Sequence, residues 1–235
     1  MKNLIPLTKS IIPACDVANK EEFEKIIIET CDIPGIGAYK VGLELTILFG
    51  LKILVEIARR HTDLPIIYDH QKGGTDIPDL GTKFAKSCAA TGVDAVILFP
   101  FGGSVTEREW IKACQSEGLK TIVGGHMTQK NFLASEDGFI ADNAPERIYE
   151  VAMESGIRDF VVPGNKQDLV VKYRRLFENE GINFSLYAPG FIAQGGSITD
   201  CGKVAGENWH AIVGTAIYKA QNMREAARIL TSEII

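Results

Sequence analysis

The chain has 235 residues, of which 46% are hydrophobic and 23% charged, and its formal net charge is −5. This composition is typical of a soluble globular protein, and the negative balance excludes a broad basic surface for nucleic acid or an acidic membrane. Single α/β barrels commonly occupy this length. We therefore expect one domain over residues 1–235.

Cysteine usage and the absence of long apolar runs bear on the cellular compartment. The five cysteines are dispersed without C-x-x-C spacing, which predicts free thiols in a reducing compartment and neither disulfides nor a zinc site. Residues 1–10 lack the apolar core of a signal peptide, and no later run reaches membrane-spanning length. These features predict a cytoplasmic protein with no membrane partner.

Short apolar runs rich in Ile and Val recur along the chain, and most lack polar alternation. Parallel strands that are buried on both faces have this composition. We therefore predict eight strands, at residues 11–15, 38–41, 66–68, 95–99, 121–123, 160–162, 184–188 and 211–213.

The segments between these runs carry apolar residues at helical spacing. Glycines follow several of them, at positions 92, 118, 156 and 181, where a helix C-terminal cap is expected. The predicted helices cover residues 20–30, 45–60, 82–91, 106–117, 145–155, 168–180 and 223–230.

Eight strands alternating with helices predict an α/β fold, specifically a (β/α)8 TIM barrel. The alternative is an open doubly wound sheet, although no Gly-x-Gly-x-x-Gly follows the first strand. The longest polar interruption, residues 131–143, is either a lid or a long surface loop.

The most distinctive stretch follows the third predicted strand. There an apolar run ends in Asp69, Lys72 and Asp76, with Gly73 and Gly74 between the last two. Charges of both signs at a strand tip are costly to desolvate unless they face one another or a substrate. The alternative is a surface ion pair of Asp69 with Lys72 beside an ordinary turn.

Other polar residues stand at the carboxyl ends of the predicted strands, where a barrel carries its active site. Asp16 ends the first strand, Lys40 lies in the second, and His126, Met127 and Thr128 follow the fifth. Each has a simpler interpretation: Asp16 as a cap of the helix that begins near Asn19, Lys40 as a snorkelling lysine, His126 as a loop histidine.

Glycines cluster after the last two strands, and their backbone amides are suited to a phosphate group. A short extra helix is predicted at residues 197–203. We predict no metal site, because acids and lysines are interleaved and no histidine pair has ligand spacing. The residues of the predicted phosphate site are Pro189, Gly190, Gln194, Gly195, Gly196, Gly214 and Thr215.

Over nearly the whole chain, these motifs resemble orotidine 5′-phosphate decarboxylase. The segments that carry the resemblance are the strand ends at Asp16 and Lys40-Val41-Gly42, the stretch 69–78, Met127-Thr128, the block 189–196 and the stretch 212–218. The resemblance implies decarboxylation of orotidine 5′-monophosphate to uridine 5′-monophosphate, in pyrimidine biosynthesis and without a cofactor.

The resemblance also implies a role for each site residue. Lys72 is the proton donor, within a charge array formed with Lys40, Asp69 and Asp76. Asp76 enters the neighbouring subunit's site, which makes the enzyme a homodimer with shared active sites. The substrate-binding residues are Asp16 at the ribose, Lys40, Thr128 at the pyrimidine, Gln194 between base and phosphate, and Pro189, Gly195, Gly196, Gly214 and Thr215.

Two departures from the family pattern keep alternatives open. The usual Asp-x-Lys-x-x-Asp is lengthened here to Asp69-x-x-Lys72-x-x-x-Asp76, and Thr215 replaces an arginine that contacts the substrate phosphate. The alternatives are a magnesium-dependent keto-gulonate or hexulose phosphate enzyme of the same barrel family, and a phosphate-binding barrel without catalysis.

Overall fold

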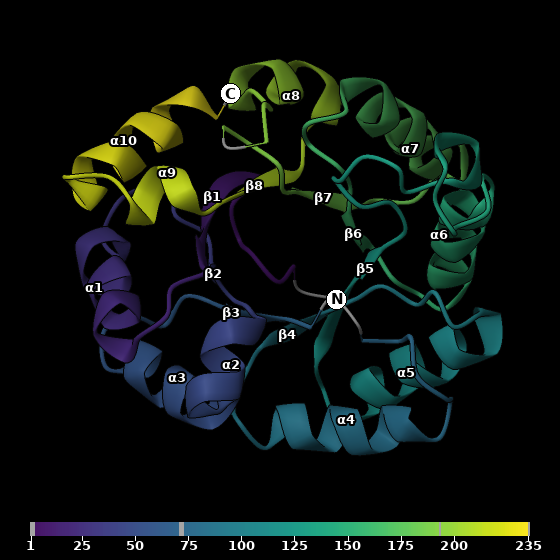
Figure 1. Ribbon diagram of the computed structural model, residues 1–235, viewed down its shortest axis with the longest axis horizontal. Coiled ribbons are helices and arrows are strands. Elements are labelled where there is room, and N and C mark those ends of the chain that lie inside the picture. Colours follow the sequence, from purple (N-terminus) through teal and green to yellow (C-terminus); the bar gives the residue numbers. More distant parts are fainter. Residues whose placement is uncertain (1–2, 71–72, 193, 235) are drawn as a thin grey trace.

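Eight parallel strands close into a barrel in which every strand pairs with its neighbours in sequence and β8 returns to β1 (Figure 1). The structure is a computed structural model that describes residues 3–70, 73–192 and 194–234. Its strands are β1 (Lys9–Cys15), β2 (Tyr39–Val41), β3 (Ile66–Asp69), β4 (Ala95–Leu98), β5 (Lys120–Gly124), β6 (Asp159–Val161), β7 (Ser185–Ala188) and β8 (Trp209–Val213). The predicted TIM barrel is confirmed, with all eight strands within two residues of their expected bounds.

The helices form a ring around the barrel (Figure 1). In the described residues they are α1 (Lys20–Thr30), α2 (Leu43–Phe49), α3 (Leu51–Arg59), α4 (Leu80–Ala89), α5 (Ser104–Ser116), the 3₁₀ turn η1 (Ala134–Glu136), α6 (Ala144–Glu154), α7 (Gln167–Asn179), α8 (Ile198–Ala205), α9 (Thr215–Tyr218) and α10 (Met223–Glu233). No helix of the described chain is both long and apolar enough to cross a membrane.

Successive side chains along each strand point alternately into the barrel and toward the helices, and this divides the hydrophobic core into two parts. Ile12 and Ala14 of β1 belong to a cluster inside the barrel, whereas Ile11 and Cys15 belong to the larger cluster between the strands and the helices. Because both faces of each strand are buried, the strands read as continuous apolar runs in the sequence.

One predicted helix, 45–60, is wrong, because the chain forms two helices that meet at Gly50. The backbone of Gly50 has φ 78°, in the left-handed region, and its amide donates to Thr46 O over 2.9 Å. This conformation ends α2 and lets α3 begin at Leu51 in a new direction. The apolar residues on both sides of Gly50 keep helical spacing, so the sequence pattern did not reveal the break between the two helices.

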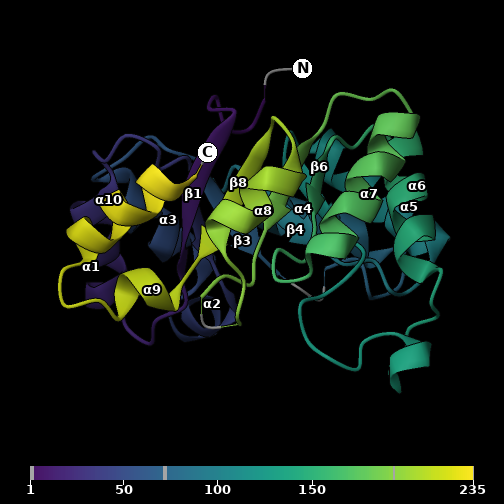
Figure 2. The same cartoon turned by 90° about the horizontal axis from the view of Figure 1, so that it is seen from above.

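The connections at the carboxyl ends of the strands gather at one end of the barrel, which we call the mouth. In side view, α2, α9 and the loop with η1 lie at the mouth, while the amino terminus lies at the opposite end (Figure 2). The loop 131–143 is internally hydrogen-bonded, since Ala134 N donates to Ile140 O and Gly138 N to Leu133 O, both over 2.7 Å.

Candidate active site

A buried lysine lies between two carboxylates at the mouth. Lys40 Nζ is 3.0 Å from Asp69 Oδ2 and 3.1 Å from Asp16 Oδ1. The Lys40 side chain is 8% exposed and that of Asp69 7%, whereas Asp16 at the rim is 48% exposed. Asp16 directly follows β1, Lys40 lies in β2 and Asp69 ends β3. The register of β2 places Lys40 opposite Ala14 of β1 and Ile67 of β3.

The array keeps Lys40 charged. Burial disfavours the ammonium form, but the charges of Asp69 and Asp16 and their hydrogen bonds outweigh it and raise the pKa of Lys40 above its ordinary value. Gly42 leaves room for this contact, since a Cβ there would lie 2.5 Å from Asp16 Oδ1. The simpler interpretations of Lys40 and Asp16 are therefore wrong: Lys40 does not snorkel, and Asn19 rather than Asp16 caps α1 by accepting from Glu22 N.

Asp69 retains an acceptor that no described group uses. Its Oδ1 atom is buried and has no hydrogen-bond partner among residues 3–70, 73–192 and 194–234. A buried carboxylate oxygen without a partner costs stability, which is a feature of sites that receive a ligand or a further charged side chain. The surface-pair interpretation of Asp69 is wrong because this carboxylate is buried.

Gly73 is held close to the end of β3 and to the segment that follows β4. Gly73 N donates to His70 O over 2.7 Å, and Gly73 O accepts from Phe99 N over 2.8 Å. A Cβ at Gly73 would lie 2.7 Å from the Leu98 side chain, so glycine is needed for this close approach. Lys72, the predicted proton donor, lies outside the described residues.

Asp76 follows Gly73 and Gly74 and is not part of the Lys40 array. It is exposed, accepts a hydrogen bond from Ile77 N over 2.7 Å, and is not among the described residues that line the cavity at the mouth. A contribution of Asp76 to an active site of its own subunit thus has no support in this geometry.

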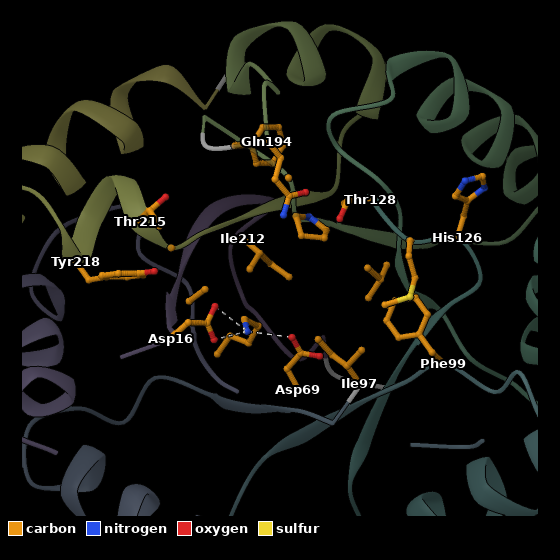
Figure 3. A pocket seen from close by; sticks show the side chains of 18 residues that line it. Asp16, Asp69, Ile97, Phe99, His126, Thr128, Gln194, Ile212, Thr215 and Tyr218 are labelled. Carbon is orange, nitrogen blue, oxygen red and sulfur yellow. Dashed lines mark hydrogen bonds and ion pairs between the residues drawn. The ribbon is translucent and has the colours of Figure 1, made fainter. Parts of the chain in front are cut away.

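The cavity at the mouth has a volume of about 220 Å³ and is lined by both polar and apolar side chains. Figure 3 shows Asp16 and Asp69 at one side, linked by the dashed lines of their ion pairs, with Tyr218 and Thr215 beside Asp16 and Gln194 reaching toward the centre. The predicted site residues that line the cavity are Asp16, Lys40, Asp69, Thr128, Pro189, Gly190, Gln194, Gly214 and Thr215, and the candidates His126 and Met127 line it too. Gly195 and Gly196 are not part of its described lining.

Seven of the described lining residues were not predicted as site residues: Ala14, Ile97, Phe99, Val161, Phe191, Ile212 and Tyr218. Ile97 and Phe99 enter from the end of β4, Phe191 from the loop after β7, and Tyr218 from α9. Phe99 lies over Gly124, where a Cβ would come within 2.3 Å of the ring. Tyr218 falls within the family-like stretch 212–218, but no spacing in the sequence indicates that a short helix turns it into the cavity.

The loop after β7 is closed by hydrogen bonds of its own. Gly195 N donates to Ile192 O over 3.0 Å, and Gly196 N donates to Gly190 O over 3.1 Å. Ile192 has φ 62°, which is unfavourable for a β-branched residue. The two amides expected to hold a phosphate are therefore engaged within this loop conformation.

Comparison with known proteins identifies the group to which these features correspond. The sequence model described as "Orotidine 5'-phosphate decarboxylase / HUMPS family" matches residues 9–230. The orotidine 5′-phosphate decarboxylase of Methanosarcina barkeri is 32% identical over 224 residues, which are 95% of this chain and 94% of that protein. The Thermococcus kodakarensis enzyme is 33% identical over 227 residues, 96% of each chain.

Solved structures agree. The orotidine 5′-monophosphate decarboxylase of Methanocaldococcus jannaschii, complexed with the inhibitor BMP, superposes with a TM-score of 0.83 at 25% identity and covers 96% of this chain and 98% of its own. The orotidine 5′-phosphate decarboxylase of Pyrococcus horikoshii has a TM-score of 0.78 at 29% identity, with 95% and 99% covered.

Proposed function

Because the chain belongs to the orotidine 5′-phosphate decarboxylase / HUMPS family, we propose that it converts orotidine 5′-monophosphate to uridine 5′-monophosphate and carbon dioxide, with Lys72 as proton donor. The observation that carries this proposal is the array at the mouth: a charged, buried Lys40 between Asp16 and Asp69, with Asp69 Oδ1 unpaired in the described part of the site. Such an array suits a reaction in which charge develops next to a departing carboxylate.

The chemistry requires stabilisation of a carbanion. The bond between C6 of the pyrimidine and its carboxylate breaks, carbon dioxide leaves, and the electron pair stays on C6. The ammonium of Lys72 then donates the proton that forms the new C6–H bond. Lys40 holds Asp69 in place by its ion pair, and Asp69 in turn keeps Lys72 charged.

Repulsion between Asp69 and the substrate carboxylate cannot supply the whole acceleration. Two unit charges about 4 Å apart interact by about 4 kcal/mol at an effective dielectric of about 20. The largest enzymatic accelerations need roughly 23 kcal/mol. Binding energy from the remote phosphate, used to order the loops and the charges, is the larger share in this proposal.

The cavity lining offers a partner for each part of the nucleotide. Thr128 is assigned to the pyrimidine, Asp16 to the ribose, and Gln194 to the bridge between base and phosphate; all three line the cavity. The phosphate is assigned to Pro189, Gly190, Gly195, Gly196, Gly214 and Thr215. Because the Gly195 and Gly196 amides now donate within their own loop, their use by a phosphate requires those two bonds to be exchanged.

The test is a spectrophotometric assay of purified protein with orotidine 5′-monophosphate in the presence of a metal chelator. Loss of the substrate's absorbance under these conditions supports the proposal. Activity that appears only when magnesium is added favours the keto-gulonate or hexulose phosphate alternative. Binding of uridine 5′-monophosphate without any turnover establishes the non-catalytic alternative.

The proposal includes a homodimer with shared sites. Asp76 is exposed at the mouth, and several large apolar side chains on elements at this end are exposed too: Leu43, Ile47 and Leu48 on α2, Ile77 next to Asp76, and Val105 at the start of α5. Exposed apolar side chains at one end of a molecule favour burial against a partner. A second copy that covers this end brings its own Asp76 toward the cavity.

Subunit mixing tests the shared site. Lys72→Ala and Asp76→Ala are each expected to be nearly inactive alone. When the two are refolded together, a mixed dimer contains one site with both Lys72 and Asp76 intact, and activity is expected to return to about a quarter of wild type by random pairing. Absence of recovery in a mixture shown to contain mixed dimers contradicts shared sites.

A further inference from the structure

A three-bond bridge joins the loop after β6 to the segment that carries Thr128. Asn165 Nδ2 donates to Thr128 O over 3.2 Å, and Lys166 Nζ donates to Gln129 O over 3.0 Å. Lys166 Nζ also lies 3.3 Å from His126 Nε2. Two adjacent residues of one loop thus hold three of the four residues from 126 to 129.

His126 provides a fixed anchor for Lys166. The histidine is buried, its ring lies 4.9 Å from that of Phe132, and its Nδ1 is 2.8 Å from the Tyr173 hydroxyl. An ammonium has donors only, so Nε2 accepts from Lys166, and Nδ1 carries the proton and donates to Tyr173. Burial first, and then the charge of Lys166, lower the pKa of His126 to about 4, so the imidazole is neutral at pH 7.

Asn165 also contacts the loop after β7. A Cβ at Gly190 would lie 3.1 Å from Asn165 Oδ1, and one at Gly196 would lie 3.2 Å from Asn165 Cα. Gly164 N donates to Pro189 O over 2.9 Å. The loop after β6 is therefore packed between the segment assigned to the base and the loop assigned to the phosphate.

We propose that Asn165 and Lys166 are positioning residues, which hold the Thr128 segment in the place where it meets the pyrimidine. The inference rests on the proposed function through the role of Thr128. Neither residue belongs to the described cavity lining, so their effect on the base passes through the backbone of residues 128 and 129. Lys166 serves the base side of the site and not the phosphate side.

Two ligands distinguish an effect on the base side of the site from one on the phosphate side: uridine 5′-monophosphate, and ribose 5-phosphate, which lacks the base. In Lys166→Met, calorimetry should show uridine 5′-monophosphate binding weakened by about tenfold, the range for loss of a charged hydrogen bond. Ribose 5-phosphate affinity should stay within about twofold, since the base side alone is disturbed. Asn165→Ala removes the donor to Thr128 O without adding a charge beside the loop assigned to the phosphate, and it should show the same selective loss.

Two control variants distinguish loss of the Lys166 contacts from loss of a positive charge elsewhere on the protein. Lys166→Arg retains donors toward Gln129 O and His126 and should restore binding to within about threefold of wild type. Lys112→Met removes an equal charge from an exposed site on α5 and should leave both affinities unchanged. Thermal unfolding of each variant reports whether the fold is retained. If Lys166→Met does not fold, Asn165→Ala decides between the two outcomes.

Each remaining outcome overturns the inference. If the affinity for both ligands falls equally, Lys166 acts as the cation that binds the phosphate. If the affinity for both is unchanged, the bridge has no role in binding. A wild type that turns over substrate while both variants bind normally refutes this inference alone. A wild type that neither binds the nucleotide nor turns it over refutes the proposed function, and the inference with it.

Discussion

Lys40 Nζ and Asp69 Oδ2 are 3.0 Å apart in a site where each side chain is less than 10% exposed. A pair this buried contributes mainly through its geometry, because desolvation offsets much of the attraction. Removal of Lys40 leaves the buried Asp69 carboxylate charged and without its cation, whereas removal of Asp69 leaves Lys40 with Asp16 as its remaining partner.

Asp69→Asn keeps the shape of the side chain and removes its charge. We expect kcat to fall by at least about 10²-fold, the usual cost of losing one preorganised electrostatic group. Asp63→Asn, an exposed acid outside the site, is the matched control and should retain wild-type kcat. A change below threefold in Asp69→Asn would contradict the assigned role.

Thr215 lines the cavity where the family usually places an arginine. If backbone amides hold the phosphate, Thr215→Ala should change KM by less than about threefold, since only one neutral hydrogen bond is at stake. Thr215→Arg introduces a guanidinium that can pair bidentately with phosphate, and KM should fall about tenfold or more. A large rise of KM in Thr215→Ala would show that the hydroxyl itself binds substrate.

Glu107 on α5 is buried, and its Oε1 has no partner among the described residues. Burial raises the pKa of Glu107 to about 8, although Arg108 opposes the shift. The folded state therefore holds the proton longer than the unfolded state, and stability falls as pH rises from the unfolded value of about 4.3 toward 8.

Glu107→Gln removes this dependence. As the pH rises from 5 to 8, the free energy of unfolding of the variant should increase relative to that of wild type by up to about 1.4 kcal/mol for each pH unit. Urea unfolding at several pH values measures it. Glu109→Gln, at an exposed position on the same helix, is the control and should follow wild type. A constant difference across this window would refute the titration of Glu107.

Two buried histidines predict acid sensitivity. Burial lowers the pKa of His210 to about 4, and burial together with Lys166 does the same for His126. Between pH 4 and the unfolded value of about 6.5, the unfolded state binds more protons. Stability is thus complete above about 6.5 and is lost as the pH falls toward 4, by up to about 1.4 kcal/mol per pH unit for each histidine.

His210→Asn tests the histidine contribution, because asparagine can replace the Nδ1 contact with Ser10 without titrating. The variant should be less stable than wild type at pH 7 but lose less stability between pH 6.5 and 4.5. An equally steep loss in both proteins would assign the acid sensitivity to other groups.

The strands and the charged strand ends were predictable because buried parallel strands leave continuous apolar runs and a barrel brings their carboxyl ends together. Contacts between distant segments left no such pattern. Lys166 meets His126 forty residues earlier, and the left-handed conformation of Gly50 breaks a helix whose apolar spacing is continuous. The loop 131–143 depends on turns and internal hydrogen bonds, which apolar periodicity does not encode.

The central claim is proton donation by Lys72, and single-turnover decarboxylation by Lys72→Ala tests it most directly. In chelator-treated protein, we predict that the rate at saturating orotidine 5′-monophosphate falls by about 10²–10⁴-fold, the range for a lost general acid. Affinity for uridine 5′-monophosphate, measured beside it, should stay within about tenfold of wild type. A Lys72→Ala variant that retains the wild-type rate would contradict the account.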